Sequence, residues 1–195
     1  MPCRTASTSY CRRTTYPARS RTGSPRPMPE PAIGKLWARG FGVVLRETTF
    51  DAALAACPTI EQALRDGIGR RHDGPLPTIP PGAECYLVRA DGEYAGLLTV
   101  ERDRPEERAA TLGVAIVPER RGRSLGVRAI FAAERRLRRE GVRAFQGRAP
   151  RTNGHGMYFW FRVGYVPLRG EDRGDGATWF ELPKRRRRRR APRSA

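Results

Sequence analysis

The stretch GVAIVPERRGRSLG, residues 113–126, decides the fold of this chain. Its apolar, partly β-branched start predicts a buried strand, and Pro118 ends that strand because proline has no N–H to donate to a ladder. An arginine-rich turn follows, and apolar residues then recur on one face at helical spacing, namely Leu125, Ala129, Ile130, Ala133 and Leu137. A helix that begins near Ser124 would point its first free N–H groups into the turn. Such a turn suits a phosphate or pyrophosphate.

Most of the positive charge lies at the two ends of the chain. The net charge is +18 over 195 residues, and residues 1–30 hold six Arg and one Glu, while residues 184–195 hold one Lys and seven Arg. The first of these segments is too poor in apolar residues to order itself. We therefore predict a disordered basic extension over residues 1–30, one globular domain over residues 31–183 and a polyarginine tail over residues 184–195.

The remaining composition is typical of a cytoplasmic protein without a metal. In the sequence, no apolar stretch is long enough for a signal peptide or a membrane span. The four cysteines show no C-x-x-C spacing, and the chain has two histidines. We therefore expect reduced thiols and no metal site.

The arginine-rich turn resembles the acetyl-CoA motif of the GNAT N-acetyltransferase superfamily, which reads Arg or Gln, two residues, Gly, one residue, Gly or Ala. Arg121 takes the first place of this motif and Gly126 the last, while Ser124 replaces the middle glycine. Because serine has a Cβ, we expect Ser124 to keep a negative φ. Its hydroxyl could then cap the helix or bind a phosphate.

A second resemblance to the same superfamily lies in NGHGMYFWFRVGY, residues 153–165. There the family repeats an asparagine, a small residue, an aromatic residue and a Gly-Phe pair at fixed spacing. The residues in register are Asn153, Gly156, Trp160, Gly164 and Tyr165. The resemblance implies that Asn153 contacts the cofactor. In the family a tyrosine often stands at the place of Trp160 and protonates the departing thiolate, which an indole N–H cannot do near neutral pH.

The two motifs together predict a single α/β (α+β) domain, with a mixed, mostly antiparallel central sheet and flanking helices. Local patterns add a first strand over residues 40–45 and a loop over residues 70–82. Helices should start at Thr49 or Asp51 and again at Thr59, and the Asp91-Gly92 pair predicts a hairpin.

The resemblance implies an acetyl-CoA-dependent N-acetyltransferase that acts on an amine of a small molecule or a protein. In such enzymes two central strands splay apart, and the backbone of the first strand pairs with the pantetheine arm. A free N–H there can also polarise the thioester carbonyl. The cofactor-binding residues expected here are Ile116, Val117, Arg121, Gly122, Arg123, Ser124, Leu125, Gly126 and Asn153.

The catalytic acid and base are not identified by the sequence. Many family members carry a glutamate on the strand before the loop, but residues 111–117 contain none. The candidates are Glu101, for which a solvated surface role is the alternative, and Tyr158, which lies in an aromatic run typical of a core. A catalytically weak or inactive module that binds CoA is therefore the alternative function.

The polyarginine run Lys184 to Arg190 allows a further kind of partner. Such a run binds nucleic-acid phosphates without sequence preference, and the affinity falls steeply with salt. A basic nucleic-acid-associated module is thus a second alternative, and a solvated extension without a partner is a third. A homodimer is also left open.

Overall fold

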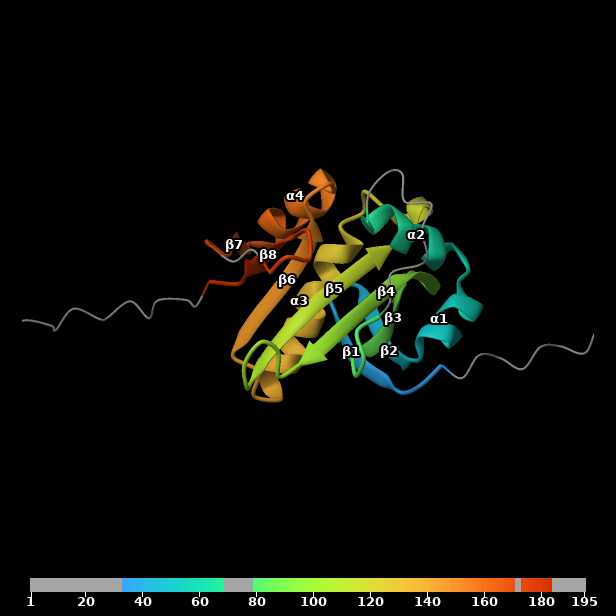
Figure 1. Ribbon diagram of the computed structural model, residues 1–195. Coiled ribbons are helices and arrows are strands. Elements are labelled where there is room, and N and C mark those ends of the chain that lie inside the picture. Colours follow the sequence, from blue (N-terminus) through green and yellow to red (C-terminus); the bar gives the residue numbers. More distant parts are fainter. Residues whose placement is uncertain (1–32, 69–78, 171–172, 184–195) are drawn as a thin grey trace, which may run out of the picture.

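The computed structural model describes residues 33–68, 79–170 and 173–183 (Figure 1). The elements along the chain are β1 (Leu36–Gly40), β2 (Val43–Thr48), α1 (Phe50–Ala56), α2 (Thr59–Ile68), β3 (Glu84–Ala90), β4 (Glu93–Arg102), β5 (Ala109–Ile116), a 3-10 turn η1 (Pro118–Arg120), α3 (Leu125–Arg139), β6 (Ala144–Pro150), α4 (Gly154–Val163), β7 (Val166–Pro167) and β8 (Ala177–Glu181). The predictions for residues 1–30, for residues 184–195 and for most of the loop at 70–82 lie outside the described residues.

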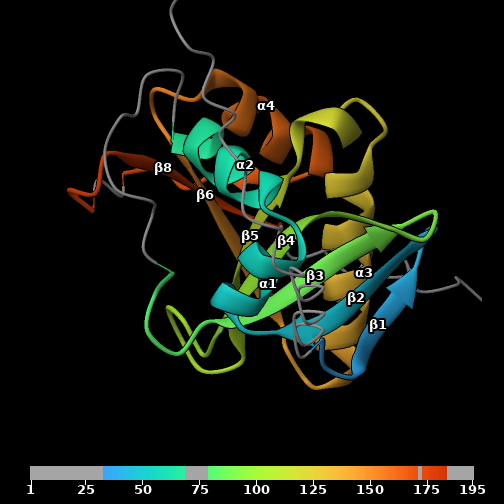
Figure 2. The same cartoon turned by 90° about the vertical axis from the view of Figure 1, so that its right-hand side faces the viewer.

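One eight-stranded sheet organises the domain, in the order β1-β2-β3-β4-β5-β6-β8-β7. Every pair of neighbouring strands is antiparallel except β5 and β6, which are parallel. Helix α3 covers one face of the sheet, and α1 and α2 lie on the other (Figure 2). The prediction of a mixed, mostly antiparallel sheet with flanking helices in an α+β domain is confirmed.

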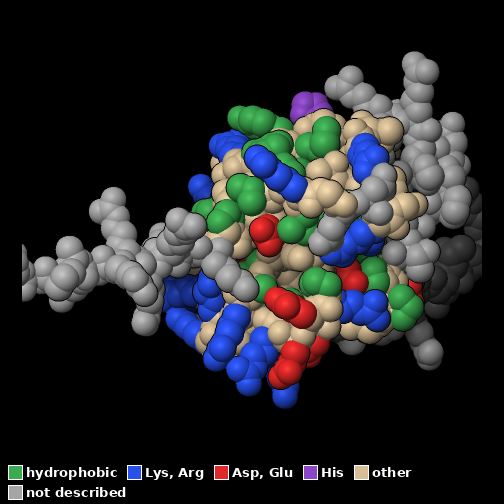
Figure 3. Space-filling view, turned by 60° about the vertical axis from the view of Figure 1, so that its left-hand side comes forward, with side chains coloured by type: hydrophobic (Ala, Val, Ile, Leu, Met, Phe, Trp, Pro, Cys, Tyr) green, Lys and Arg blue, Asp and Glu red, His purple; other side chains and the backbone are tan. Residues whose placement is uncertain are grey.

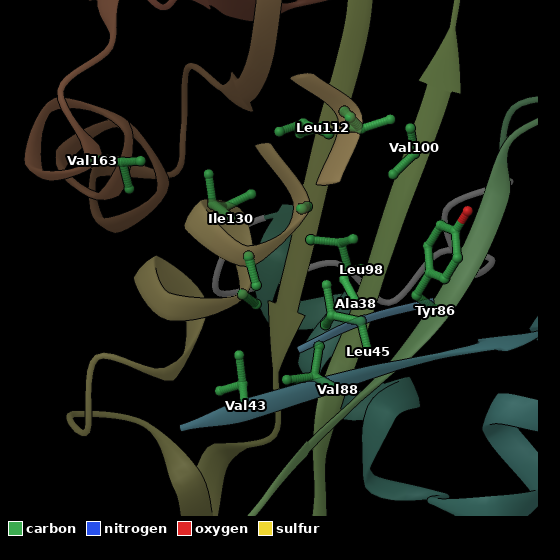
Figure 4. Packing of buried hydrophobic residues seen from close by; sticks show 14 of the residues in the cluster. Ala38, Val43, Leu45, Tyr86, Val88, Leu98, Val100, Leu112, Ile130 and Val163 are labelled. Atoms are coloured by element: carbon green, nitrogen blue, oxygen red, sulfur yellow. The ribbon is translucent and has the colours of Figure 1, made fainter. Parts of the chain in front are cut away.

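Hydrophobic residues fill the space on both faces of the sheet. Successive strand residues point to opposite faces. Leu98 of β4 therefore packs in one cluster with Ile130 of α3 (Figure 4). Leu97 packs on the other face, in a cluster with Ile60 of α2. All five apolar positions predicted for the helix face of α3 are buried. Within the described ranges no helix is long and apolar enough to cross a membrane.

The first predicted strand, over residues 40–45, is wrong because the chain reverses inside it. Phe41 and Gly42 have φ of 55° and 75°, and they form the tight turn between β1 and β2. An apolar run without a polar turn residue concealed this reversal. The ring of Phe41 instead makes an edge contact with Phe131 of α3, at 5.9 Å between centroids.

The other turn signals agree with the structure. The Thr49 hydroxyl caps α1 by accepting from the Ala52 N–H at 3.2 Å. Asp91 and Gly92 both have positive φ, at 54° and 84°, and they join β3 to β4. Hence short-range turn chemistry was readable in the sequence.

Basic side chains gather at the lower end of the molecule, where α3 finishes (Figure 3). The exposed arginines of this helix end are Arg135, Arg136, Arg138 and Arg139. Arg136 pairs with Glu140, and Arg138 lies 3.8 Å from Glu134. Acidic neighbours therefore offset part of this charge.

Candidate functional site

A cleft opens where β5 and β6 diverge. The two strands pair in parallel from Ala109 with Ala144 to Leu112 with Gly147, and their register ends there. Both strands continue beyond this point, to Ile116 and to Pro150, without further pairing to each other. A cleft of about 700 Å³ lies between the separating strands. The ends of both strands line it, together with residues of α2, α3 and α4.

The backbone of β5 turns unpaired polar groups toward this cleft. On its other edge β5 pairs with β4, and the Val117 N–H donates to the Ala95 carbonyl at 3.0 Å. Since backbone groups alternate in direction along an antiparallel strand, the N–H and C=O of Val114 and Ile116 point to the cleft. The Val114 N–H is the first one beyond the closed end of the divergence. An extended ligand with amide groups can pair with this edge as an added strand would.

The N-terminus of α3 opens into the same cleft. Ser124 precedes the helix with φ of 57°, so the expected negative φ is wrong. A left-handed residue costs roughly 1–2 kcal/mol when it is not glycine, which explains why the family motif has glycine here. The expected cap is also wrong, because the Ser124 hydroxyl accepts from Arg162 Nη2 at 3.3 Å instead. The first N–H groups of α3 thus stay available to an anion.

Gly126 allows close packing at the floor of this loop. A Cβ at this position would lie 3.1 Å from Phe159 Cε2 and 3.5 Å from Ile116 Cγ1. A larger residue would push α3 away from α4 and from the end of β5. Glycine here therefore keeps the helix N-terminus next to the strand edge, which fits a ligand that spans both.

Arg121 bridges β5 and α2 across the mouth of the cleft. Its Nε donates to the Ile116 carbonyl at 2.9 Å, and its Nη1 lies 2.7 Å from Asp66 Oδ2. The Arg121 guanidinium lowers the pKa of Asp66 below its ordinary value. Burial of the carboxyl acts in the opposite direction, and a hydrogen bond from Gln62 adds to the lowering. Among the described residues that line the cleft, Asp66 is the one carboxylate.

Asn153 uses both polar atoms of its side chain. Its Oδ1 accepts from the Gly156 N–H at 2.8 Å and so caps α4, as expected for the start of that helix. Its Nδ2 donates to the Gly67 carbonyl of α2 at 2.8 Å. The second motif is thereby tied to the end of α2.

Trp160 lies at the closed end of the cleft, beside Gly147, the last residue of β6 that pairs with β5. It is 3% exposed, and its indole Nε1 donates to the Arg148 carbonyl at 3.0 Å. The ring lies against Gly147, where a Cβ would approach its Cζ2 to 2.3 Å. Trp160 therefore fills this place and offers no titratable proton.

The structure brings most of the predicted site residues to the cleft. Those that line it are Ile116, Arg121, Gly122, Ser124, Leu125, Gly126, Asn153 and Tyr158. Val117 is buried with its N–H bonded to β4, and Arg123 is exposed outside the lining. Glu101 lies on β4 opposite Thr111, beyond the closed end of the divergence. Tyr158 stands at the rim with 64% of its surface exposed.

Sequence reasoning missed several polar lining residues, among them Arg162, Arg148 and Asp66. Arg162 lies two positions after Trp160 inside the second motif, so its helical spacing was a usable signal. Arg148 follows Gly147, the last residue of β6 that pairs with β5. Asp66 is 55 residues from Arg121 in the chain, and nothing local announced their contact. In the described segments, no three His, Cys, Asp or Glu side chains gather to hold a metal ion.

Comparison with known proteins agrees with this geometry. The family model described as Acetyltransferase (GNAT) family matches residues 47–165. Among solved structures, the GNAT domain of S. lividans PAT is 16% identical with a TM-score of 0.57, over 74% of this chain and 96% of that one. RimL, a ribosomal L7/L12 alpha-N-protein acetyltransferase in complex with coenzyme A, is 14% identical with a TM-score of 0.58, over 75% and 97%.

An acetyltransferase from Thermus thermophilus is 22% identical with a TM-score of 0.54, over 73% of this chain and 97% of that one. At such identities these likenesses show the shared fold. A search of curated proteins finds no significant match. The family model, however, spans more than half of the sequence. The chain therefore belongs to the GNAT acetyltransferase family.

Proposed function

We propose that this protein is an acetyl-CoA-dependent N-acetyltransferase that acetylates an amine of a small molecule or a protein. The observation that carries the proposal is the continuity of the cleft, which joins a free strand edge on β5 to the open N-terminus of α3. The ligand that matches both parts has amide groups at one end and a pyrophosphate at the other. The RimL structure with this fold holds coenzyme A, which supports the choice.

The residues present fit this cofactor. The backbone of Val114 and Ile116 would pair with the pantetheine amides, and the Val114 N–H would polarise the carbonyl of the reacting group. The N–H groups of the loop at residues 122–126 would hold the pyrophosphate, with charge from Arg121 and Arg162. Acetyl-CoA, when bound, supplies an acetyl group already activated as a thioester. The protein then mainly has to position that group against a neutral amine.

The cleft offers fewer suitable groups for proton transfer than for cofactor binding. Trp160 cannot donate a proton to the departing thiolate. Tyr158 lines the cleft and carries a hydroxyl, so it is the better placed of the two sequence candidates, whereas Glu101 would need a chain of waters to reach the cleft. We propose Tyr158 as the acid, with the acceptor amine losing its proton to water.

A module that binds CoA with little or no turnover is the second candidate. The specific observation in its favour is Trp160, which occupies the place of the usual acid. Its indole N–H donates to the Arg148 backbone carbonyl, which holds the ring in this position. The nucleic-acid contact through Lys184 to Arg190 lies outside the described residues and stays a prediction. A cytoplasmic location and a homodimer likewise stay predictions.

Calorimetric titration of acetyl-CoA into the full chain tests the proposal. Saturable binding, followed by release of free thiol in the presence of a panel of amines, would support an acetyltransferase. Binding without thiol release from any amine would support the module without turnover. Absence of binding to the folded protein would contradict both.

A further inference from the structure

The C-terminal end of α2 lies at the mouth of the cofactor cleft. Asp66 and Gly67, consecutive residues of this helix, both line the cleft. The helix also packs against β5 and the turn η1. The last turn of α2 therefore lies beside the unpaired edge of β5 and the loop at residues 122–126.

Two of the polar side chains expected to contact the cofactor, Arg121 and Asn153, are bonded to this helix end. Arg121 Nη1 lies 2.7 Å from Asp66 Oδ2, and Asn153 Nδ2 donates to the Gly67 carbonyl at 2.8 Å. Arg121 and Asn153 come from two separate motifs on opposite sides of the cleft. That one helix end engages both of them indicates a common role.

These contacts compete with the cofactor. A phosphate that approaches Arg121 meets the Asp66 carboxylate on the same guanidinium, and two anions in such proximity repel each other. Arg121 Nε also bonds the Ile116 carbonyl, one of the two C=O groups that β5 turns to the cleft. A pantetheine amide that pairs with this edge needs the same carbonyl.

We infer that the end of α2 is a latch: Asp66 and Gly67 hold Arg121 and Asn153 in the cofactor-free protein, and cofactor binding releases the helix end. This inference rests on the proposed function, because it takes CoA as the ligand of the cleft. Asp66 is then a residue that sets cofactor affinity without touching the reacting atoms. Helix α2 packs on the sheet face opposite α3. Its release therefore changes the surface on the α2 side of the sheet, and this change follows cofactor binding.

Two charge-matched variants on the same helix test the latch. Asp66→Asn removes the competing charge and keeps one oxygen for Gln62, whose Nε2 donates to Asp66 at 2.7 Å. Glu61→Gln removes the same charge from a carboxylate that pairs with Arg65 on α2 itself, at 2.9 Å. The Asp66 and Arg121 side chains are 35% and 43% exposed, so their ion pair is of modest strength. Calorimetry with acetyl-CoA at one salt concentration should show D66N binding about two- to fivefold tighter than the intact chain.

The control E61Q should shift the affinity less than D66N does. Equal or weaker binding by D66N, while the intact chain binds, would overturn the latch and leave the proposed function standing. No binding by any of the three folded proteins would overturn the proposed function and the latch with it.

Amide hydrogen exchange gives an independent readout. Ligand binding ordinarily slows exchange, so α3 should become protected when CoA saturates the cleft. The latch requires the opposite in α2, where the amides of Thr59–Ile68 should exchange faster. Protection of α2 by CoA would overturn the release and show instead that the helix end closes over the ligand.

Discussion

The two sides of the cleft depart from the GNAT pattern in different ways. On the side of β5 and α3, Ser124 replaces a glycine, and the groups that face the cleft belong to the backbone. On the side of β6 and α4, Trp160 replaces a tyrosine, and the group that would act belongs to a side chain. A backbone N–H survives a change of side chain, whereas a proton donor does not. We therefore expect the proposed cofactor binding and turnover to respond separately to changes in this sequence.

Two departures in the second motif, at Trp160 and at Tyr165, are accommodated by the surrounding structure. Trp160 fits because Gly147 leaves room for its ring. Tyr165, at the place of the family's phenylalanine, donates its hydroxyl to the buried Glu134 of α3 at 2.9 Å. Burial raises the pKa of Glu134, and this bond partly opposes the rise. The second motif is thus built into the core, while the first motif lies at the surface of the cleft.

The largest effect is expected at Gly147, on the tryptophan side. Gly147→Ala would place a Cβ 2.3 Å from the Trp160 ring, so the ring or the strand must move. We expect a loss of about 3 kcal/mol in the free energy of unfolding, measured by urea denaturation. The control is G154A, because a Cβ at Gly154 meets nothing within 4 Å. A G147A protein as stable as G154A would mean that Trp160 does not occupy this space.

The next effect is on cofactor binding at the loop side. Gly126→Val should push α3 from Phe159 and Ile116 and misplace the N–H groups of the first turn. Loss of one or two such contacts corresponds to about 1–3 kcal/mol, or roughly tenfold or more in the Kd for acetyl-CoA by calorimetry. Thermal melting must show that the variant is folded. Unchanged affinity in a folded variant would contradict the placement of the pyrophosphate.

Replacing Trp160 by the family's tyrosine tests whether turnover can change while cofactor binding stays the same. Trp160→Tyr should raise kcat about tenfold, because a hydroxyl returns to the place of the usual acid. Its Kd for acetyl-CoA should stay close to that of the intact chain, since the backbone donors are untouched. W160F is the matched control, with an aromatic ring and no proton to give. If W160F gains as much as W160Y, space and not acidity limits turnover.

The smallest effect is expected at Ser124. Ser124→Gly relieves a left-handed residue with φ of 57°, so the free energy of unfolding should rise by about 1 kcal/mol. Binding of acetyl-CoA should change little, because glycine presents the same N–H groups. Ser124→Ala, which keeps the Cβ, separates this strain from the bond that Arg162 donates to the hydroxyl. A stability of S124G equal to that of S124A would argue against strain.

Local patterns determined much of this protein from sequence alone. The strand, loop and helix over residues 113–139, the cap at Thr49 and the hairpin at Asp91-Gly92 follow from side-chain periodicity and turn preferences, which act over a few residues. The same holds for the two motifs, whose spacing is set by single elements. The reversal at Phe41 escaped prediction because no turn-forming polar residue marks it.

Tertiary structure decided what lies between the motifs. The parallel pairing of β5 with β6 and its end at Leu112 and Gly147 depend on how α3 returns the chain, and these create the cleft. The left-handed Ser124 follows from the path of the loop and not from the preference of serine. Asp66 reaches Arg121, and Gly67 reaches Asn153, across 55 and 86 residues. Contacts at such separation arise from packing of whole elements, so no short pattern in the sequence encodes them.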